Sequence, residues 1–191
     1  MLKTLLIAVR ALVVMTMATG VLYPLAVTMT GRLLFRETAF GSVVLRGTNV
    51  IGSLLLAQQF VDDKYFWPRP SACDYGTMPA SGSNLGPTSK ALRKLVDKRR
   101  RNFLARQPQG LTNAVPEELL CASGSGVDPH LSPSAAAAQI ERVAAARGFN
   151  ERQHAQLHTL VNQLVEAPQF GVLGCPRVNV LRLNVALDQL H

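Results

Sequence analysis

The sequence predicts a single N-terminal transmembrane helix followed by a soluble domain of mixed α/β (α+β) structure. Residues 11–31 form a stretch without a charged side chain, and residues 32–191 have the composition of a soluble protein in which strand-like and helix-like patterns alternate. An apolar run of about 20 residues is long enough for a helix to cross a hydrocarbon core of about 30 Å. The rest of the chain suffices for one domain with its own core.

Cationic residues flank the apolar stretch on both sides, where their side chains can reach lipid headgroups: Lys3, Arg10, Arg32 and Arg36. A cleaved signal peptide is the alternative, because the charged start and the small residues 18–20 resemble one. Apolar residues continue through Val27, which favours a retained single-pass anchor. Pro24 frees a backbone carbonyl within the span, and Thr28, Thr30 or a neighbouring helix would satisfy it.

Two strands and a long loop are expected after the anchor. Apolar runs at residues 43–45 and 50–56 flank Gly47, Thr48 and Asn49, a pattern typical of two strands joined by a turn. Residues 65–88 are dominated by proline, glycine, serine and asparagine. Such a loop is too long for a simple connection and is more typical of a functional or flexible segment.

The net charge of +8 is concentrated in one predicted helix, Lys90 to Arg106, which holds eight basic residues and one acidic residue. Ser89 is the expected N-cap, and Pro108 closes the helix. Two interpretations stay open: the cations form a solvated face, or they contact anionic lipid or an acidic partner. Nucleic acid is not expected as a partner, because the segment lacks interleaved stacking aromatic residues.

Three helices and a strand are predicted near the C-terminus. Ser132 caps an alanine-rich helix that runs through Arg147, and Asn150 with Gln153 forms a capping box for a second helix, which Pro168 ends. Residues 177–183 contain the alternation of a strand with one wet face. Asn184 is expected to cap a short final helix.

Catalytic and metal-binding patterns are mostly missing from the sequence. Neither Ser123 nor Ser125 has the flanking glycines of a nucleophile elbow. His154 and His158 lie one helical turn apart, but the glutamate of a zinc hydrolase is not between them, so two polar residues on a wet face are expected and no metal site is predicted. The three cysteines allow at most one disulfide and match no zinc pattern: Cys73, Cys121 and Cys175.

Two loops of small residues, 81–87 and 122–130, are the best candidates for a contact site. Exposed backbone N–H groups beside hydroxyl side chains can cradle an anion or the backbone of a partner, and tight structural turns are the alternative. The candidate contact residues in the first loop are Ser81, Gly82, Ser83, Asn84 and Gly86, and in the second Ser123, Gly124, Ser125, Gly126, Asp128 and His130.

Taken together, four blocks in order resemble the C subunit of the Kdp-type potassium-transporting ATPase: residues 65–72, 81–87, 122–133 and 176–181. The resemblance covers nearly the whole chain and includes the pair Tyr23 and Pro24 inside the N-terminal helix. The chain departs from the family pattern where the 81–83 loop is one glycine short, where Pro68 replaces a usual glycine and where Arg182 replaces a common acid.

The resemblance implies an accessory, non-catalytic subunit of a high-affinity potassium importer in the bacterial inner membrane. Its implied partners are a pore-forming subunit that handles potassium and a P-type subunit that hydrolyses ATP. It further implies a cytoplasmic segment 1–10, the single span 11–31 and a periplasmic domain 32–191. ATP binding is implied through the glycine-rich loops and Gln139. An anchored serine hydrolase, and a module that binds anionic lipid through Lys90 to Arg106, are the alternatives.

Overall fold

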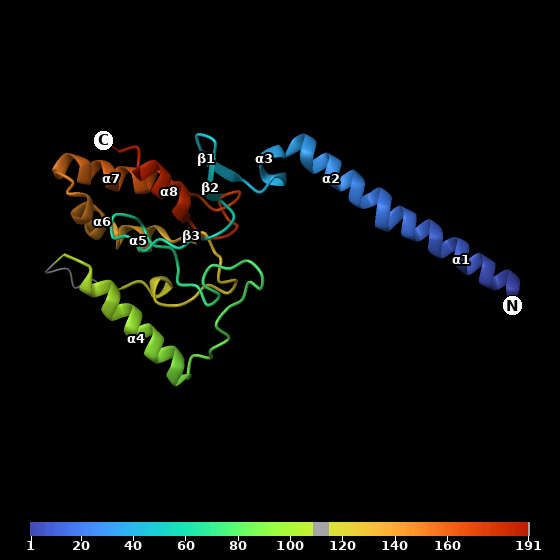
Figure 1. Cartoon of the computed structure of the whole chain (residues 1–191), viewed down its shortest axis with the longest axis horizontal. Coiled ribbons are helices and arrows are strands. Elements are labelled where there is room, and N and C mark those ends of the chain that lie inside the picture. Colours follow the sequence, from blue (N-terminus) through green and yellow to red (C-terminus); the bar gives the residue numbers. More distant parts are fainter. Residues whose placement is uncertain (109–114, 191) are drawn as a thin grey trace. The chain divides into compact units, whose positions relative to one another are not determined.

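The computed structural model describes residues 1–108 and 115–190, and the chain divides into two compact units, Met1–Val43 and Val44–His191. The predicted fold class is confirmed: one long apolar helix precedes a mixed domain of helices and small sheets (Figure 1).

The first unit is dominated by a continuous helix, Leu2–Leu34, which is long and apolar enough to cross a membrane. It consists of α1 (Leu2–Thr16), a π-helical segment (Met17–Leu22) and α2 (Tyr23–Leu34), and a short helix, α3 (Arg36–Ala39), follows. Helical structure therefore extends beyond both ends of the uncharged stretch, because most of the flanking residues, 2–10 and 32–34, are good helix formers.

The π-helical segment ends at Leu22, two residues before Pro24. A proline ring clashes with the carbonyl four residues earlier, here that of Gly20. The backbone N–H of Tyr23 donates to the carbonyl of Ala18, five residues back, so the helix widens at the turn where proline interrupts the regular ladder. Thr30, one of the residues predicted to satisfy the freed carbonyl, donates to the Ala26 carbonyl instead, at 2.8 Å.

The predicted hairpin lies at the start of the second unit, and its first strand begins at the boundary residue Val43. Strands β1 (Val43–Arg46) and β2 (Asn49–Ser53) form a two-stranded sheet, and Gly47 adopts a left-handed φ of 64° in the turn. The second strand ends at Ser53, earlier than the predicted residue 56, where the chain enters an irregular segment that continues to Ser89.

The core of the second unit lies between a small antiparallel sheet and four helices. The strand order is β3 (His130–Leu131), β5 (Arg177–Asn179) and β4 (Val165–Glu166), with Val178 opposite both Leu131 and Val165. The helices are α5 (Pro133–Ala137), α6 (Ile140–Arg147), α7 (Glu151–Gln163) and α8 (Val180–Leu187). Helix α7 contacts the other three helices. Its buried residues Leu157 and Val161 join Phe66 and Val178 in the core.

The prediction of one continuous helix from Ser132 to Arg147 is wrong, because this segment forms two helices, α5 and α6. Ser132 does cap α5 and Gly148 ends α6 in the left-handed conformation, but the chain breaks the helix at Ala138 and Gln139. At the break, the N–H of Gln139 bonds the Ala136 carbonyl three residues back. The buried Gln139 side chain is thereby directed at the irregular segment, a tertiary contact that helix propensity does not encode.

Two further boundaries differ from the prediction. Helix α7 has the predicted capping box of Asn150 and Gln153, but it ends at Gln163 because the next residues pair with β5. The predicted strand 177–183 stops at Asn179, whose side chain accepts from Arg182 N and caps α8. Asn184 is therefore not an N-cap but a buried residue within α8.

Helix α4 (Lys90–Ala105) is capped by Ser89 as predicted, and Phe103 is its buried residue. Two cations in and directly after this helix serve the fold: Arg99 donates to the Leu120 carbonyl at 2.7 Å, and Arg106 pairs with Asp63 at 3.0 Å. A 3-10 helix, Glu117–Leu119, follows after residues 109–114, which lie outside the described part of the chain.

Candidate functional site

The two predicted small-residue loops lie against each other. A Cβ atom placed on Gly82 would lie 2.8 Å from the carbonyl oxygen of Gly124, and one on Gly126 would lie 2.6 Å from that of Ser81. Gly126 also has a φ of 73°, a left-handed conformation that L side chains rarely adopt. Glycine at these positions is thus required for the loops to approach at backbone contact distance.

The base of this loop pair is buried and internally bonded. Ser123 is buried, and its N–H donates to the Pro70 carbonyl at 3.3 Å, while Ser125 Oγ accepts from the N–H of Val127 at 3.2 Å. Within the described residues, the hydrogen bonds of Ser123 and Ser125 include none to a histidine. The serine hydrolase alternative therefore has no support from the geometry of these loops.

The outer surface of the loop pair is small and polar. Ser81, Ser83, Asn84 and Gly86 are exposed in the first loop, and Gly124 and Ser125 are exposed in the second. Asn84 has a left-handed φ of 51°, which asparagine tolerates better than most residues. The pair presents backbone and short side chains on a bonded base, a surface suited to close contact with another protein.

Asp128 and His130, at the end of the second loop, form an ionic and hydrogen-bonded group with Arg69. Asp128 Oδ1 accepts from the N–H of His130 at 3.0 Å, and Arg69 Nη1 lies 3.2 Å from Asp128 Oδ2. Hydrogen bonding from the His130 side chain is the main cause that lowers the pKa of Asp128 below its usual value, with the Arg69 charge contributing. The ionised Asp128 carboxylate therefore links the second loop to Arg69 by an ion pair.

A cavity of about 320 Å³ opens beside this group. Its lining is Arg69, Glu118, Asp128, His130, Leu131, Ser132, Cys175, Pro176 and Arg177. The charges that line it already have partners: Arg177 Nε pairs with Glu166 at 3.0 Å, and the Glu118 carboxylate accepts from the N–H and hydroxyl of Ser132. Among the described residues, these pairings leave the cavity weakly suited to binding a polyanion such as a nucleotide.

Gln139, predicted as a nucleotide contact, is fully buried and its side-chain amide is completely hydrogen-bonded. Oε1 accepts from the Trp67 N–H at 2.8 Å and from Arg142 Nη2 at 2.7 Å. Nε2 donates to the carbonyls of Trp67 at 3.1 Å and Ala135 at 3.4 Å. Both lone pairs and both N–H groups are used, so the structure places Gln139 in the interior and away from the two loops' exposed surface.

Sequence reasoning missed the group of residues that holds the irregular segment at residues 63–67. Arg142 donates to the carbonyls of Asp63 at 2.6 Å and Tyr65 at 3.1 Å, and its guanidinium lies 3.7 Å from the centre of the Trp67 ring. Burial lowers the pKa of Arg142 to about 10. The sequence offers no local signal for this role, because α6 also carries Arg147, which is not buried, and only tertiary packing distinguishes the two arginines.

Comparison with known proteins places this sequence in a family. The family model described as "K+-transporting ATPase, c chain", KdpC, matches residues 5–189. The chain belongs to the KdpC family. A potassium-transporting ATPase KdpC subunit from Methylococcus capsulatus is 47% identical over 96% of this chain and 96% of its own length. The corresponding subunit from Xanthomonas oryzae pv. oryzae is 49% identical over 89% of this chain and 79% of its own.

Membership of the KdpC family confirms the resemblance predicted from the four sequence blocks. Those blocks have a physical basis in the fold. Residues 65–72 are held by buried side chains of α8 and of the break between α5 and α6, the loops 81–87 and 122–130 pack on each other, and residues 176–181 contain β5 and the cap of α8.

Proposed function

We propose that this chain is an accessory, non-catalytic subunit of an ATP-driven potassium import complex. The main support for this proposal is the match of the KdpC family model to residues 5–189. Relatives that are 45–49% identical to this chain and cover most of it add to this support. The serine hydrolase and lipid-binding alternatives gain no comparable support. Potassium would be handled by a pore-forming partner subunit, and ATP would be hydrolysed by a P-type partner subunit.

The proposed contact surface for these partners is the loop pair, residues 81–87 and 122–130. Its support is the backbone contact between Gly82 and Gly124, which sits on buried Ser123 and leaves short polar residues exposed. Small exposed residues on a bonded base lose little side-chain entropy on docking, so such a surface suits a stable subunit contact.

Co-purification of the complex through a tag on the ATP-hydrolysing partner tests this role. Gly82→Ala should separate the loops, because its Cβ meets the carbonyl oxygen of Gly124, and should reduce the amount of this chain recovered with the partners. Gln163→Ala is the control, since Gln163 is exposed on α7 and lies outside the loop pair. Equal recovery of the two variants and the wild type would contradict docking through the loop pair.

The proposed topology is a single span in a bacterial inner membrane, a cytoplasmic segment 1–10 and a periplasmic domain. The apolar helix Leu2–Leu34 supports the single span, and the side of the membrane follows from the family resemblance. Cys175 is an exposed thiol and gives a direct test. A membrane-impermeant maleimide should label Cys175 in intact spheroplasts, and protection until the membrane is lysed would reverse the proposed orientation.

The proposed effect on ATP is indirect. The four internal hydrogen bonds of Gln139 support a structural role for this residue, so any rise in ATP affinity of the complex would act through contact with the ATP-hydrolysing partner. Photo-crosslinking with an azido-ATP analogue should label the partner and not this chain. Labelling of residues in loop 122–130 would instead assign a nucleotide contact to this subunit.

A further inference from the structure

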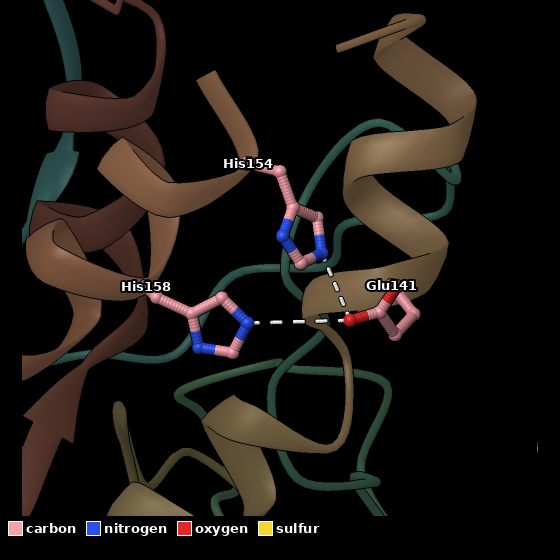
Figure 2. A group of neighbouring side chains, drawn as sticks. All are labelled: Glu141, His154 and His158. Atoms are coloured by element: carbon pink, nitrogen blue, oxygen red, sulfur yellow. Dashed lines mark hydrogen bonds and ion pairs between the residues drawn. The ribbon is translucent and has the colours of Figure 1, made fainter. Parts of the chain in front are cut away.

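Two helices bring together three side chains that can bind a metal ion: Glu141, His154 and His158 (Figure 2). His154 Nε2 lies 2.8 Å from Glu141 Oε1, and His158 Nε2 lies 4.0 Å from the same oxygen. One ligand atom from each residue lies within 4.8 Å of the other two. The sequence predicted two polar residues on a wet face, and the structure adds a carboxylate from another helix beside them.

The three side chains are carried by two packed helices, α6 and α7. His154 and His158 are spaced by four residues on α7 and share one helix face, and their ring centroids lie 4.9 Å apart. Glu141 lies in the first turn of α6, which contacts α7. The capping box of Asn150 and Gln153 fixes the start of α7 after the turn. The ligand atoms therefore do not depend on a long loop for their position.

We propose that Glu141, His154 and His158 form a surface site for a divalent transition-metal ion, with Zn²⁺ as the representative ion. Zinc binds imidazole nitrogen at about 2.0–2.1 Å and carboxylate oxygen at about 2.0–2.2 Å, so its ligand atoms stand a little over 3 Å apart. The two observed distances to Glu141 Oε1, 2.8 Å from His154 Nε2 and 4.0 Å from His158 Nε2, lie on either side of this separation. A rotation of the His158 side chain would bring its nitrogen to coordination distance. Imidazole ligands favour zinc, copper and nickel over potassium or magnesium.

The exposure of the three side chains suits ion entry and leaves coordination positions for water. The exposed fractions are 43% for Glu141, 32% for His154 and 49% for His158. A bound ion would replace the hydrogen bond between His154 and Glu141 and join α6 to α7 directly.

Titration of the full-length chain in detergent with ZnCl₂, followed by calorimetry, tests the site. One Zn²⁺ should bind per chain, and a titration with Co²⁺ should produce the visible absorption of a coordinated ion. His154→Gln, His158→Gln and Glu141→Gln should each weaken Zn²⁺ binding by about tenfold or more, since loss of even an outer-shell partner costs about 10–100-fold.

His130→Gln is the matched control, because it removes a histidine that lies outside the cluster. It should bind Zn²⁺ like the wild type. Circular dichroism and the fluorescence of Trp67, the only tryptophan, would show that each variant is folded. Failure of the folded wild type to bind Zn²⁺, or unchanged affinity in the three ligand variants, would overturn the proposal. Loss of Zn²⁺ binding in His130→Gln, with binding unchanged in the three ligand variants, would also overturn the proposal.

Discussion

Gln139 and Trp67 exchange two hydrogen bonds: the Trp67 N–H donates to Gln139 Oε1 at 2.8 Å, and Gln139 Nε2 donates to the Trp67 carbonyl at 3.1 Å. The preceding residue is held in the same way, since Asn184 exchanges two bonds with the backbone of Phe66, at 2.8 and 2.9 Å. Two buried amide side chains thus do for this segment what a neighbouring strand does in a sheet. They fix the start of the loop that leads to the candidate contact surface.

Removing the Gln139 amide should destabilise the domain markedly. Gln139→Ala leaves the partly buried N–H and carbonyl of Trp67 without their Gln139 partners, so we expect a loss of about 2 kcal/mol in the free energy of unfolding. Urea unfolding followed by Trp67 fluorescence measures it. Gln163→Ala, at an exposed position on α7, is the control and should change stability little. Equal stability of both variants would refute the bonding role of Gln139.

Gly126→Ala should disrupt the loop pair more than Gly86→Ala. At Gly126 a Cβ meets the Ser81 carbonyl oxygen and the backbone has a φ of 73°, whereas Gly86 has open space around it. Left-handed strain alone costs about 1–2 kcal/mol, and the steric contact adds to it. Thermal unfolding of the two variants gives the comparison, and a Gly126→Ala protein as stable as Gly86→Ala would show that the loops tolerate separation.

Tyr75 should make stability depend on alkaline pH. Burial raises the pKa of Tyr75 to about 12, and its hydroxyl donates to the Arg69 carbonyl at 3.1 Å. An unfolded tyrosine loses its proton near a pKa of about 10, so the folded state holds a proton that the unfolded state has lost between these values. Stability present below pH ~10 is therefore lost as the pH rises toward 12. Tyr75→Phe should flatten this part of the unfolding-versus-pH curve, and an unchanged slope would count against a buried phenol.

Asp128 should contribute the opposite dependence at acid pH. Its pKa is lowered by the His130 hydrogen bond, so its contribution is present above the usual aspartate pKa and is lost as the pH falls through the lowered value. Asp128→Asn should reduce stability at neutral pH and remove part of the decline in acid. Chemical unfolding at a series of pH values measures both effects, and parallel curves for the variant and the wild type would contradict them.

Local signals in the sequence predicted the local structure well. The Ser89 cap of α4, the Asn150 and Gln153 capping box and the turn at Gly47 are confirmed, because each depends on residues a few positions apart. The pairing of the two small-residue loops was not derivable, since it joins Gly82 to Gly124 across the fold.

Long-range contacts also explain the errors. The predicted helix is interrupted at Gln139, whose side chain bonds the backbone of Trp67. Asn184 was expected to cap a helix, but it is buried and bonds the backbone of Phe66. Glu141 joins His154 only because α6 and α7 pack together. In each case a polar residue has a partner at a distance in sequence that periodicity does not encode.

Potassium-stimulated ATP hydrolysis by the purified complex, with and without this chain, tests the accessory role most directly. The account predicts that hydrolysis falls when the chain is absent and returns when the purified full-length chain is added back, while the chain alone hydrolyses no ATP. Unchanged hydrolysis by the complex without the chain, or ATP hydrolysis by the isolated chain, would contradict it.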